Sequence, residues 1–138
     1  MAEWTEAEEH VLRHLRKLGF QHIQRPDWIA RDKQGRWWSF EVKAKERFEP
    51  PPFAGHGLNA SQLHSRLALQ VEKGIRAVLV VLDPEIGWIM APLDQLSNGP
   101  LHKTRNGVII FPIDRFRKVE GLMEREFIDA AQTGGVLV

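Results

Sequence analysis

The sequence contains two carboxylates and a lysine that can meet in space: Asp27, Glu41 and Lys43. Glu41 and Lys43 are two residues apart in a stretch of alternating polarity, so in a β-strand their side chains lie on the same face. Burying a carboxylate with an ammonium group is costly unless the two groups pair or meet a metal ion. Two carboxylates beside a lysine offer the oxygen ligands that suit magnesium or manganese. The chemistry indicated is therefore that of a hard divalent cation.

A predicted β-hairpin brings these residues together. Its strands, Trp28–Arg31 and Arg36–Ala44, flank the polar turn Asp32–Gly35. Thirteen residues separate Asp27, at the start of the first strand, from Glu41. The hairpin can therefore place the strand that starts at Asp27 alongside the strand that holds Glu41.

The rest of the chain carries helical and extended patterns on both sides of this hairpin. Thr5 and Glu8 form a capping-box pattern that predicts a helix over Thr5–Leu18. Asn59 is a good helix N-cap and Gly74 a natural stop, which predicts a second helix to about Lys73. Further strands are expected at Phe20–Gln24, Ile75–Leu82, Trp88–Ala91 and Val108–Pro112, and a last helix at Val119–Ala131. The predicted fold class is α/β, a mixed sheet between helices in a single domain over residues 1–138.

The segment Glu46–Leu58 has a different composition. It contains three consecutive prolines and the glycines Gly55 and Gly57, so we expect no regular structure in it. A loop this long in a small domain is usually functional or disordered. His56, between the two glycines, is expected to be exposed and able to touch a backbone phosphate.

Composition excludes several classes of protein. The chain has 138 residues, enough for one domain, and 43% of them are hydrophobic, enough for a core. The absence of cysteine excludes disulfides and cysteine-ligated metals and fits a cytoplasmic, intracellular setting. The longest apolar run, Ala77–Leu82, is far shorter than the roughly 20 residues of a membrane span. The sequence has no glycine-rich phosphate loop, so we expect no nucleoside triphosphate as a partner.

Charge is unevenly distributed along the chain, although the net charge is only +1. Residues 10–47 carry ten Lys or Arg against four Asp or Glu. A basic segment of this kind can attract an anionic partner such as a nucleic acid, but a solvated charged surface has the same composition.

The residues that could hold a cation resemble the motifs of the PD-(D/E)XK nucleases. Pro26-Asp27 matches the PD element, and Glu41-Val42-Lys43 matches the E-x-K element. The order of the expected elements is also similar to that family's restriction-endonuclease-like αβββαβ core.

Within that family the sequence is most similar to small archaeal-type Holliday junction resolvases. Those proteins carry a helix glutamate eleven residues before a Gly-Phe pair, and Glu8 precedes Gly19-Phe20 at that distance here. They also carry a glutamine on the helix after the E-x-K strand, which Gln62 resembles. The resemblance covers residues 5–96, and residues 97–138 would form a C-terminal extension.

The resemblance implies a magnesium-dependent endodeoxyribonuclease, with manganese as a substitute ion. Asp27 and Glu41 would bind one or two ions, with the carbonyl of Val42 as a further ligand. Glu8 would reach the metal from the first helix, directly or through water. Lys43 would hold the attacking water and stabilise charge on the phosphate.

Two of these residues have a second interpretation. Glu8 and Gln62 each stand three residues after a predicted helix cap, Thr5 or Asn59, and each can serve only to close that cap. The sequence leaves both interpretations open.

The sequence departs from the resolvase pattern in one place. Only six residues separate Phe20 from Asp27, whereas the resolvases have a longer loop there. The alternatives are therefore a restriction, repair or phage nuclease without junction preference, or a nucleic-acid-binding module of the same fold that does not cleave.

DNA is the expected partner. The residues expected to contact it are Arg25, Lys45, Arg47, His56 and Gln62. Because cutting both strands needs two sites, we expect a homodimer, with an interface formed by apolar residues outside the family-like core. Those residues are Ile109, Ile110, Phe111, Leu122, Met123, Phe127 and Ile128. The alternative is that the C-terminal segment folds back over its own sheet. Glu46–Leu58 would then be a DNA-facing flap that becomes ordered with substrate.

Overall fold

The computed structural model describes residues 13, 16, 21–24, 28–31, 34–44 and 46–118, and only the backbone of residues 21–24, 28 and 30. The predicted helix Thr5–Leu18 lies outside these ranges apart from Arg13 and Arg16, which are helical. The predicted last helix, Val119–Ala131, lies wholly outside them.

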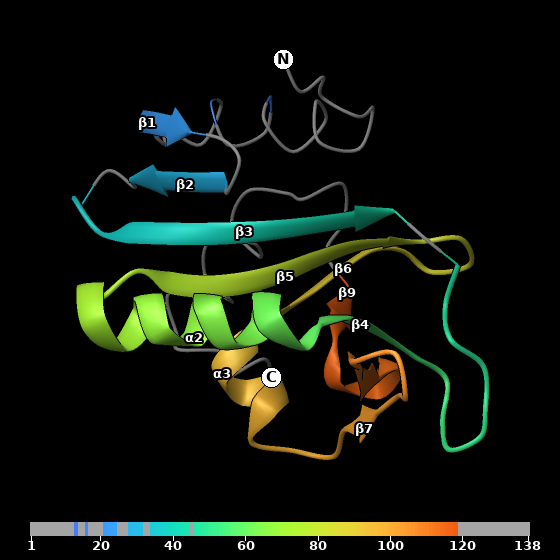
Figure 1. Cartoon of the computed structure of the whole chain (residues 1–138). Coiled ribbons are helices and arrows are strands. Elements are labelled where there is room, and N and C mark those ends of the chain that lie inside the picture. Colours follow the sequence, from blue (N-terminus) through green and yellow to red (C-terminus); the bar gives the residue numbers. More distant parts are fainter. Residues whose placement is uncertain are drawn as a thin grey trace.

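A mixed sheet of six strands runs through the described part of the chain in the order β1–β2–β3–β5–β6–β9 (Figure 1). Its strands are β1 Gln21–Gln24, β2 Trp28–Arg31, β3 Trp37–Ala44, β5 Arg76–Asp83, β6 Gly87–Pro92 and β9 Arg117–Lys118. The strands β2 and β3 form the predicted antiparallel hairpin, with Trp28 opposite Phe40. The strands β3 and β5 run parallel, with Glu41 opposite Leu79. These pairings confirm the expected mixed sheet.

The connection between β3 and β5 contains helix α2, Ala60–Lys73. The helix begins where the sequence predicts, because the Asn59 side chain accepts a hydrogen bond from the backbone N–H of Ser61 at 2.9 Å. It ends at Gly74, whose φ of 69° is a left-handed conformation that glycine adopts without strain. No helix in the described ranges is long and apolar enough to cross a membrane.

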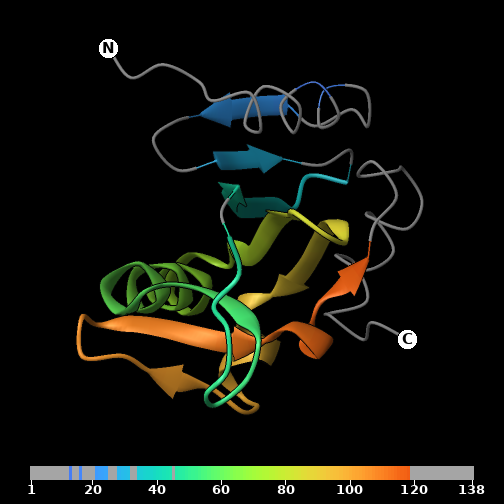
Figure 2. The same ribbon diagram turned by 90° about the vertical axis from the view of Figure 1, so that its right-hand side faces the viewer.

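A second sheet has the order β4–β8–β7 and is made of β4 Gly55–Asn59, β8 Val108–Pro112 and β7 His102–Lys103. Figure 2 shows β8 and β7 below α2, away from β1 and β2. The prediction of no regular structure in Glu46–Leu58 is therefore wrong from Gly55 onward. A β-carbon at Gly55 or Gly57 would meet the backbone of β8. The glycines thus allow close pairing of two strands.

The main core fills the space between the large sheet, α2 and the second sheet. Its buried side chains come from β5, β6, β4, β8, α2 and the short helix α3, Leu93–Ser97. Fully buried members include Leu79, Val81, Leu93 and Phe111. The two sheets and α2 therefore share one core, and the second sheet supports the helix from the side opposite β3.

One part of the expected dimer interface is wrong. Ile109, Ile110 and Phe111 are buried, at 6%, 5% and 0% exposure. They belong to β8, which pairs with both β4 and β7 and so folds back onto its own domain. The other apolar residues proposed for that interface, at positions 122, 123, 127 and 128, lie outside the described residues.

Candidate active site

Glu41 and Lys43 lie on the face of β3 that is turned toward α2. Glu41 is opposite Leu79 and Lys43 is opposite Val81 in the parallel register with β5. Both of these β5 side chains pack in the same core as Leu63 of α2. Residues in register point to the same side of a sheet, so the acid and the lysine share the α2 face, as the alternation of the sequence predicts.

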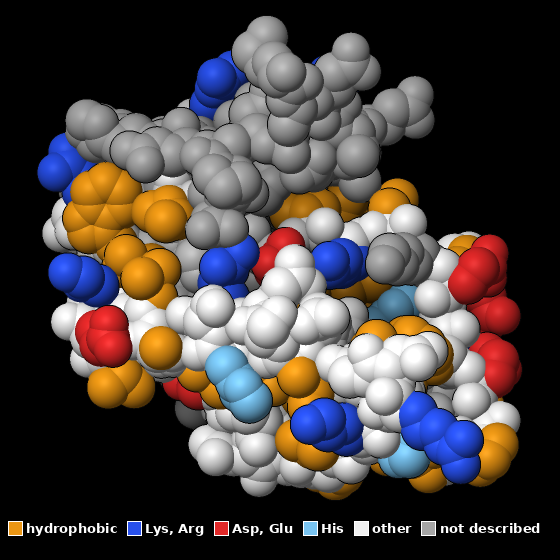
Figure 3. All heavy atoms as spheres, viewed as in Figure 1, with side chains coloured by type: hydrophobic (Ala, Val, Ile, Leu, Met, Phe, Trp, Pro, Cys, Tyr) orange, Lys and Arg blue, Asp and Glu red, His pale blue; other side chains and the backbone are white. Residues whose placement is uncertain are grey.

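Arg66 of α2 pairs with the central acid of this face. Its Nη2 donates to Oε1 of Glu41 at 3.1 Å, and the two side chains are 11% and 16% exposed. A carboxylate this far buried needs a positive partner, and α2 supplies one. In Figure 3, an acidic side chain is flanked by basic side chains in the region between β3 and α2.

Lys43 is half-buried two residues beyond Glu41 on the same face. Among the residues that the structure describes, it has no hydrogen-bond or ion-pair partner. Its ammonium group lies on the same face as the Glu41 carboxylate.

Gln62 lies in the first turn of α2 and is half-buried. The helix cap is closed by Ser61, whose backbone N–H and hydroxyl both donate to the Asn59 side chain, at 2.9 and 2.6 Å. Within the described part of the chain no hydrogen bond joins Gln62 to Asn59. The interpretation of Gln62 as a capping residue therefore has no support in the geometry.

Four of the predicted site residues, Glu8, Arg25, Asp27 and Lys45, lie outside the described residues. The described residue after Asp27 is Trp28, which pairs with Phe40, the neighbour of Glu41. The hairpin thus brings the start of β2 to the level of Glu41, as expected. In the described ranges, no three His, Asp or Glu side chains are grouped as metal ligands.

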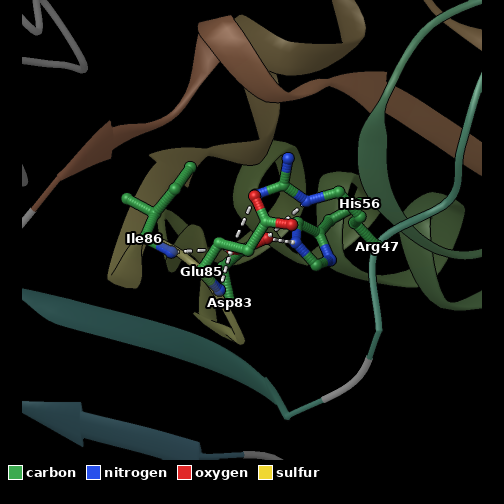
Figure 4. Close-up of polar contacts among 5 residues, drawn as sticks. All are labelled: Arg47, His56, Asp83, Glu85 and Ile86. Atoms are coloured by element: carbon green, nitrogen blue, oxygen red, sulfur yellow. Dashed lines mark hydrogen bonds and ion pairs between the residues drawn. The ribbon is translucent and has the colours of Figure 1, made fainter.

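A second polar cluster surrounds Asp83 at the carboxyl end of β5 (Figure 4). Arg47 donates to both carboxylate oxygens of Asp83, at 3.2 and 2.8 Å. His56 Nε2 lies 2.7 Å from Oδ2, and Oδ1 also accepts from the backbone N–H groups of Glu85 and Ile86. The Asp83 side chain is fully buried, so these five hydrogen bonds satisfy a carboxylate that water does not reach.

These contacts change the acid–base properties of the Asp83 cluster. Burial by itself raises the pKa of the Asp83 carboxyl, but the hydrogen bonds from Arg47, His56 and the backbone outweigh it and hold that pKa well below its usual range. The pKa of Arg47 shifts in the opposite direction: its hydrogen bond to Asp83 raises it. Asp83 is therefore ionised at neutral pH.

The Asp83 cluster holds two residues that the sequence predicts as DNA contacts, and it corrects the expected exposure of one of them. His56 is not exposed as expected: it is 3% exposed, and its ring packs edge-on against Phe116, with centroids 6.2 Å apart. The physical reason is that β4 pairs with β8 and carries the imidazole inward. Arg47, expected to contact phosphate, pairs instead with Asp83 and, at 3.4 Å, with Glu85.

The expected flap is held at both ends. Arg47 and His56 tie the segment between β3 and α2 to Asp83. Phe48 and Gly55 add two backbone hydrogen bonds, at 2.8 and 3.0 Å. Only the proline-containing tip between these anchors is left as a loop, so the prediction of a segment that is ordered only with substrate does not fit the structure.

Sequence reasoning missed Arg66 and Asp83. Arg66 follows Gln62 by four residues and so shares its side of α2, but helical spacing alone gives an arginine no partner. Asp83 precedes Pro84 at a turn, a position where aspartate often binds following backbone N–H groups. That signal identifies two of its five hydrogen bonds.

No family model and no curated protein matches the chain. Among solved structures, the fold is similar to that of Hjc from Archaeoglobus fulgidus, a Holliday junction resolvase from an archaeal hyperthermophile. The TM-score is 0.54 at 20% sequence identity, over 80% of this chain and 84% of that chain. The chain therefore has the mixed-sheet fold of a small archaeal resolvase, as the sequence motifs predicted.

Proposed function

We propose that the protein is a metal-dependent endodeoxyribonuclease that hydrolyses phosphodiester bonds in structured DNA, in the manner of a Holliday junction resolvase. The observation that carries this proposal is the shared face of Glu41 and Lys43 on the central strand of a resolvase-like fold. A carboxylate and an ammonium group with no ion-pair partner among the described residues are suited to a divalent cation and a phosphate.

The donors near Glu41 suit Mg²⁺, or Mn²⁺ in its place. The carboxylate of Glu41 and the backbone carbonyl of Val42 are oxygen ligands on adjacent residues, and Asp27 precedes the strand that pairs beside them. We infer that these three residues hold the ion and that Glu8 adds a ligand, directly or through water. When bound, the ion neutralises charge on the phosphate and lowers the pKa of water.

The chain's own side chains then have separate roles. Lys43 orients the attacking water and stabilises charge on the phosphoryl oxygens, because its ammonium group is not committed to another described residue. Arg66 holds the Glu41 carboxylate in one orientation through the 3.1 Å contact. Gln62, one turn earlier on α2, faces the same region and contacts the phosphate or a water beside it.

A non-cleaving nucleic-acid-binding module is the main alternative function. The presence of Asp27, Glu41 and Lys43 together favours an enzyme, because a binding module has no need of this set. We also propose a homodimer that works in DNA recombination or repair, since resolving a junction requires two cuts. Only six residues separate Phe20 from Asp27, so a restriction, repair or phage nuclease without junction preference is the alternative among the enzymes.

A plasmid-nicking assay tests the enzyme. Supercoiled DNA incubated with the protein and Mg²⁺ or Mn²⁺ should become nicked, and EDTA or the Glu41→Gln substitution should prevent it. DNA binding without nicking in either metal would identify a non-cleaving module. Comparing cleavage of a four-way junction, a flap, a linear duplex and a single strand then determines the preferred DNA structure.

A further inference from the structure

The hairpin formed by β7 and β8 presents a cluster of basic side chains. His102, Lys103 and Arg105 are all exposed. No Asp or Glu occurs in the sequence between Asp94 and Asp114, so the hairpin has no acid of its own. Figure 3 shows blue and pale-blue side chains around β7 and no red ones there. We call His102, Lys103 and Arg105 the basic hairpin.

The basic hairpin has a defined backbone. The N–H of Thr104 donates to the carbonyl of Val108 at 2.9 Å, and the N–H of Gly107 donates to the carbonyl of Thr104 at 3.1 Å. The hydroxyl of Thr104 also accepts from the N–H of Val108 at 3.1 Å, and Gly107 adopts the positive φ of 78° that the turn requires. The cations are thus carried on a fixed turn.

These cations do no structural work within the described residues. Neither Lys103 nor Arg105 has a hydrogen-bond or ion-pair partner in the described ranges, and both side chains lie at the surface. Arg47 and His56, by contrast, contact the Asp83 carboxylate, at 2.8 and 2.7 Å. Lys103 and Arg105 are therefore within direct reach of a phosphate, whereas the two predicted contacts Arg47 and His56 are held by Asp83.

The basic hairpin lies close to the Glu41 site. The carbonyl of Gly107 accepts a hydrogen bond at 2.8 Å from the N–H of Ala60, the first residue of α2. Arg66, the partner of Glu41, follows six residues later, about 9 Å along the helix axis at roughly 1.5 Å per residue. One strand of DNA rises about 3.4 Å per phosphate, so a duplex that crosses the site reaches the turn within a few base pairs.

We propose that the basic hairpin binds the phosphate backbone of the double-helical DNA arm next to the scissile bond, so that the DNA track runs from Glu41 over the start of α2 to β7. This inference rests on the proposed function and adds a binding surface to it. Phosphate contacts of this kind position a duplex without reading its sequence. The track thus extends from Glu41 on the first sheet to β7 on the second sheet, beyond the residues for which the sequence predicted DNA contacts.

The test compares two double variants that remove the same charge. Lys103→Ala with Arg105→Ala removes the lysine and the arginine of the basic hairpin, and Lys73→Ala with Lys118→Ala removes two exposed lysines elsewhere. Fluorescence anisotropy in EDTA would measure the affinity of the full chain for a labelled duplex and a labelled four-way junction at several salt concentrations. Each phosphate contact contributes about 0.9 to the slope of log affinity against log salt. In the hairpin variant the slope of log affinity against log salt should therefore fall by about 1.8, and the affinity should fall about tenfold. The control variant should keep the wild-type slope.

Three results would overturn the inference. The first is an unchanged salt slope in the hairpin variant, and the second is an equal loss of slope in the control variant. The third is that the hairpin variant loses the wild-type circular dichroism spectrum while Lys103→Gln with Arg105→Gln folds and binds DNA normally. If the wild type nicks plasmid DNA but the hairpin variant binds normally, the inference fails and the proposed function stands. If the wild type neither binds nor nicks DNA, both fail.

Discussion

The guanidinium group of Arg66 on α2 lies 3.1 Å from the carboxylate of Glu41 on β3, so the helix and the central strand are joined at the candidate site by opposite charges. A divalent cation at Glu41 would share that carboxylate with Arg66. The arginine therefore has two opposing effects: it orients the acid, and it competes for its negative charge.

Replacing Arg66 should separate these two effects. Arg66→Ala should slow DNA cleavage about tenfold because Glu41 loses its fixed orientation. The same variant should bind Mn²⁺ more tightly, on the order of fivefold, because a nearby positive charge worth about 1 kcal/mol is gone. Arg66→Lys should restore the charge but only part of the orientation, because lysine lacks the planar fork of arginine.

Isothermal titration with Mn²⁺ and plasmid nicking together check this prediction. Lys73→Ala, an exposed lysine on the same helix, serves as the control and should change neither quantity. Weaker Mn²⁺ binding in Arg66→Ala would contradict the competition, and unchanged cleavage would contradict the positioning role.

Glu41 and Lys43 should differ in what they contribute. Glu41→Gln and Asp27→Ala should abolish both metal binding and cleavage but leave DNA affinity at or above the wild-type value, since each removes a negative charge. Lys43→Ala should reduce cleavage at least about 100-fold and still bind Mn²⁺, because the lysine acts on water and phosphate. Glu46→Ala, which removes an exposed acid two residues after the end of β3, should behave as wild type. Loss of Mn²⁺ binding in Lys43→Ala would show that these roles are misassigned.

Gly57 should be intolerant of any side chain. Its β-carbon would meet the carbonyl oxygen of Ile109 in β8, so Gly57→Ala must separate two strands that hold the core together. We expect a loss of about 2 kcal/mol or more in the free energy of unfolding, measured by urea denaturation. Gly35→Ala is the matched control, because Gly35 has positive φ but open space around it. This substitution should lower the free energy of unfolding by about 1 kcal/mol. Equal losses in the two variants would mean that β4 and β8 do not pair this closely in solution.

The parts of the fold that the sequence predicts are those with local signals. The hairpin of β2 and β3 follows from alternation and a polar turn, and α2 follows from its cap residues Asn59 and Gly74. In the second sheet the sequence predicts β8 at Val108–Pro112, but it carries no such signal for β4. Strand β4 pairs with β8 some fifty residues later, and the glycines of β4 have the composition of a loop. Local pattern does not distinguish a glycine needed for flexibility from one needed for close approach.

The same limit applies to the candidate site. Glu41 and Lys43 share a face because of a two-residue period, which the sequence carries directly. The contacts of Asp83 join it to Arg47, 36 residues away, and to His56, 27 residues away. Nothing in the neighbourhood of Arg47 or His56 indicates a buried carboxylate, so both side chains were expected to be free for DNA.

Asp83 should make the stability of the fold sensitive to acid. Its carboxyl has a lower pKa in the folded protein than the roughly 3.9 of an unfolded aspartate. The stabilisation is therefore fully present above that unfolded value and is lost as the pH falls toward the folded value. Asp83→Asn removes the charge from five hydrogen bonds, and we expect a loss of about 2–3 kcal/mol in the free energy of unfolding at neutral pH.

The difference in the free energy of unfolding between wild type and Asp83→Asn should shrink as the pH falls below about 4. At such pH the wild-type carboxyl binds a proton on unfolding, so its charge stabilises the folded state less. Urea denaturation from neutral to acid pH measures this difference directly. Asp114→Asn, at an exposed carboxylate on the same domain, is the control and should show a small difference that does not vary in this way. If the difference in the free energy of unfolding between wild type and Asp83→Asn stays constant down to about pH 3, the contacts of Arg47 and His56 with residue 83 do not depend on the charge of Asp83.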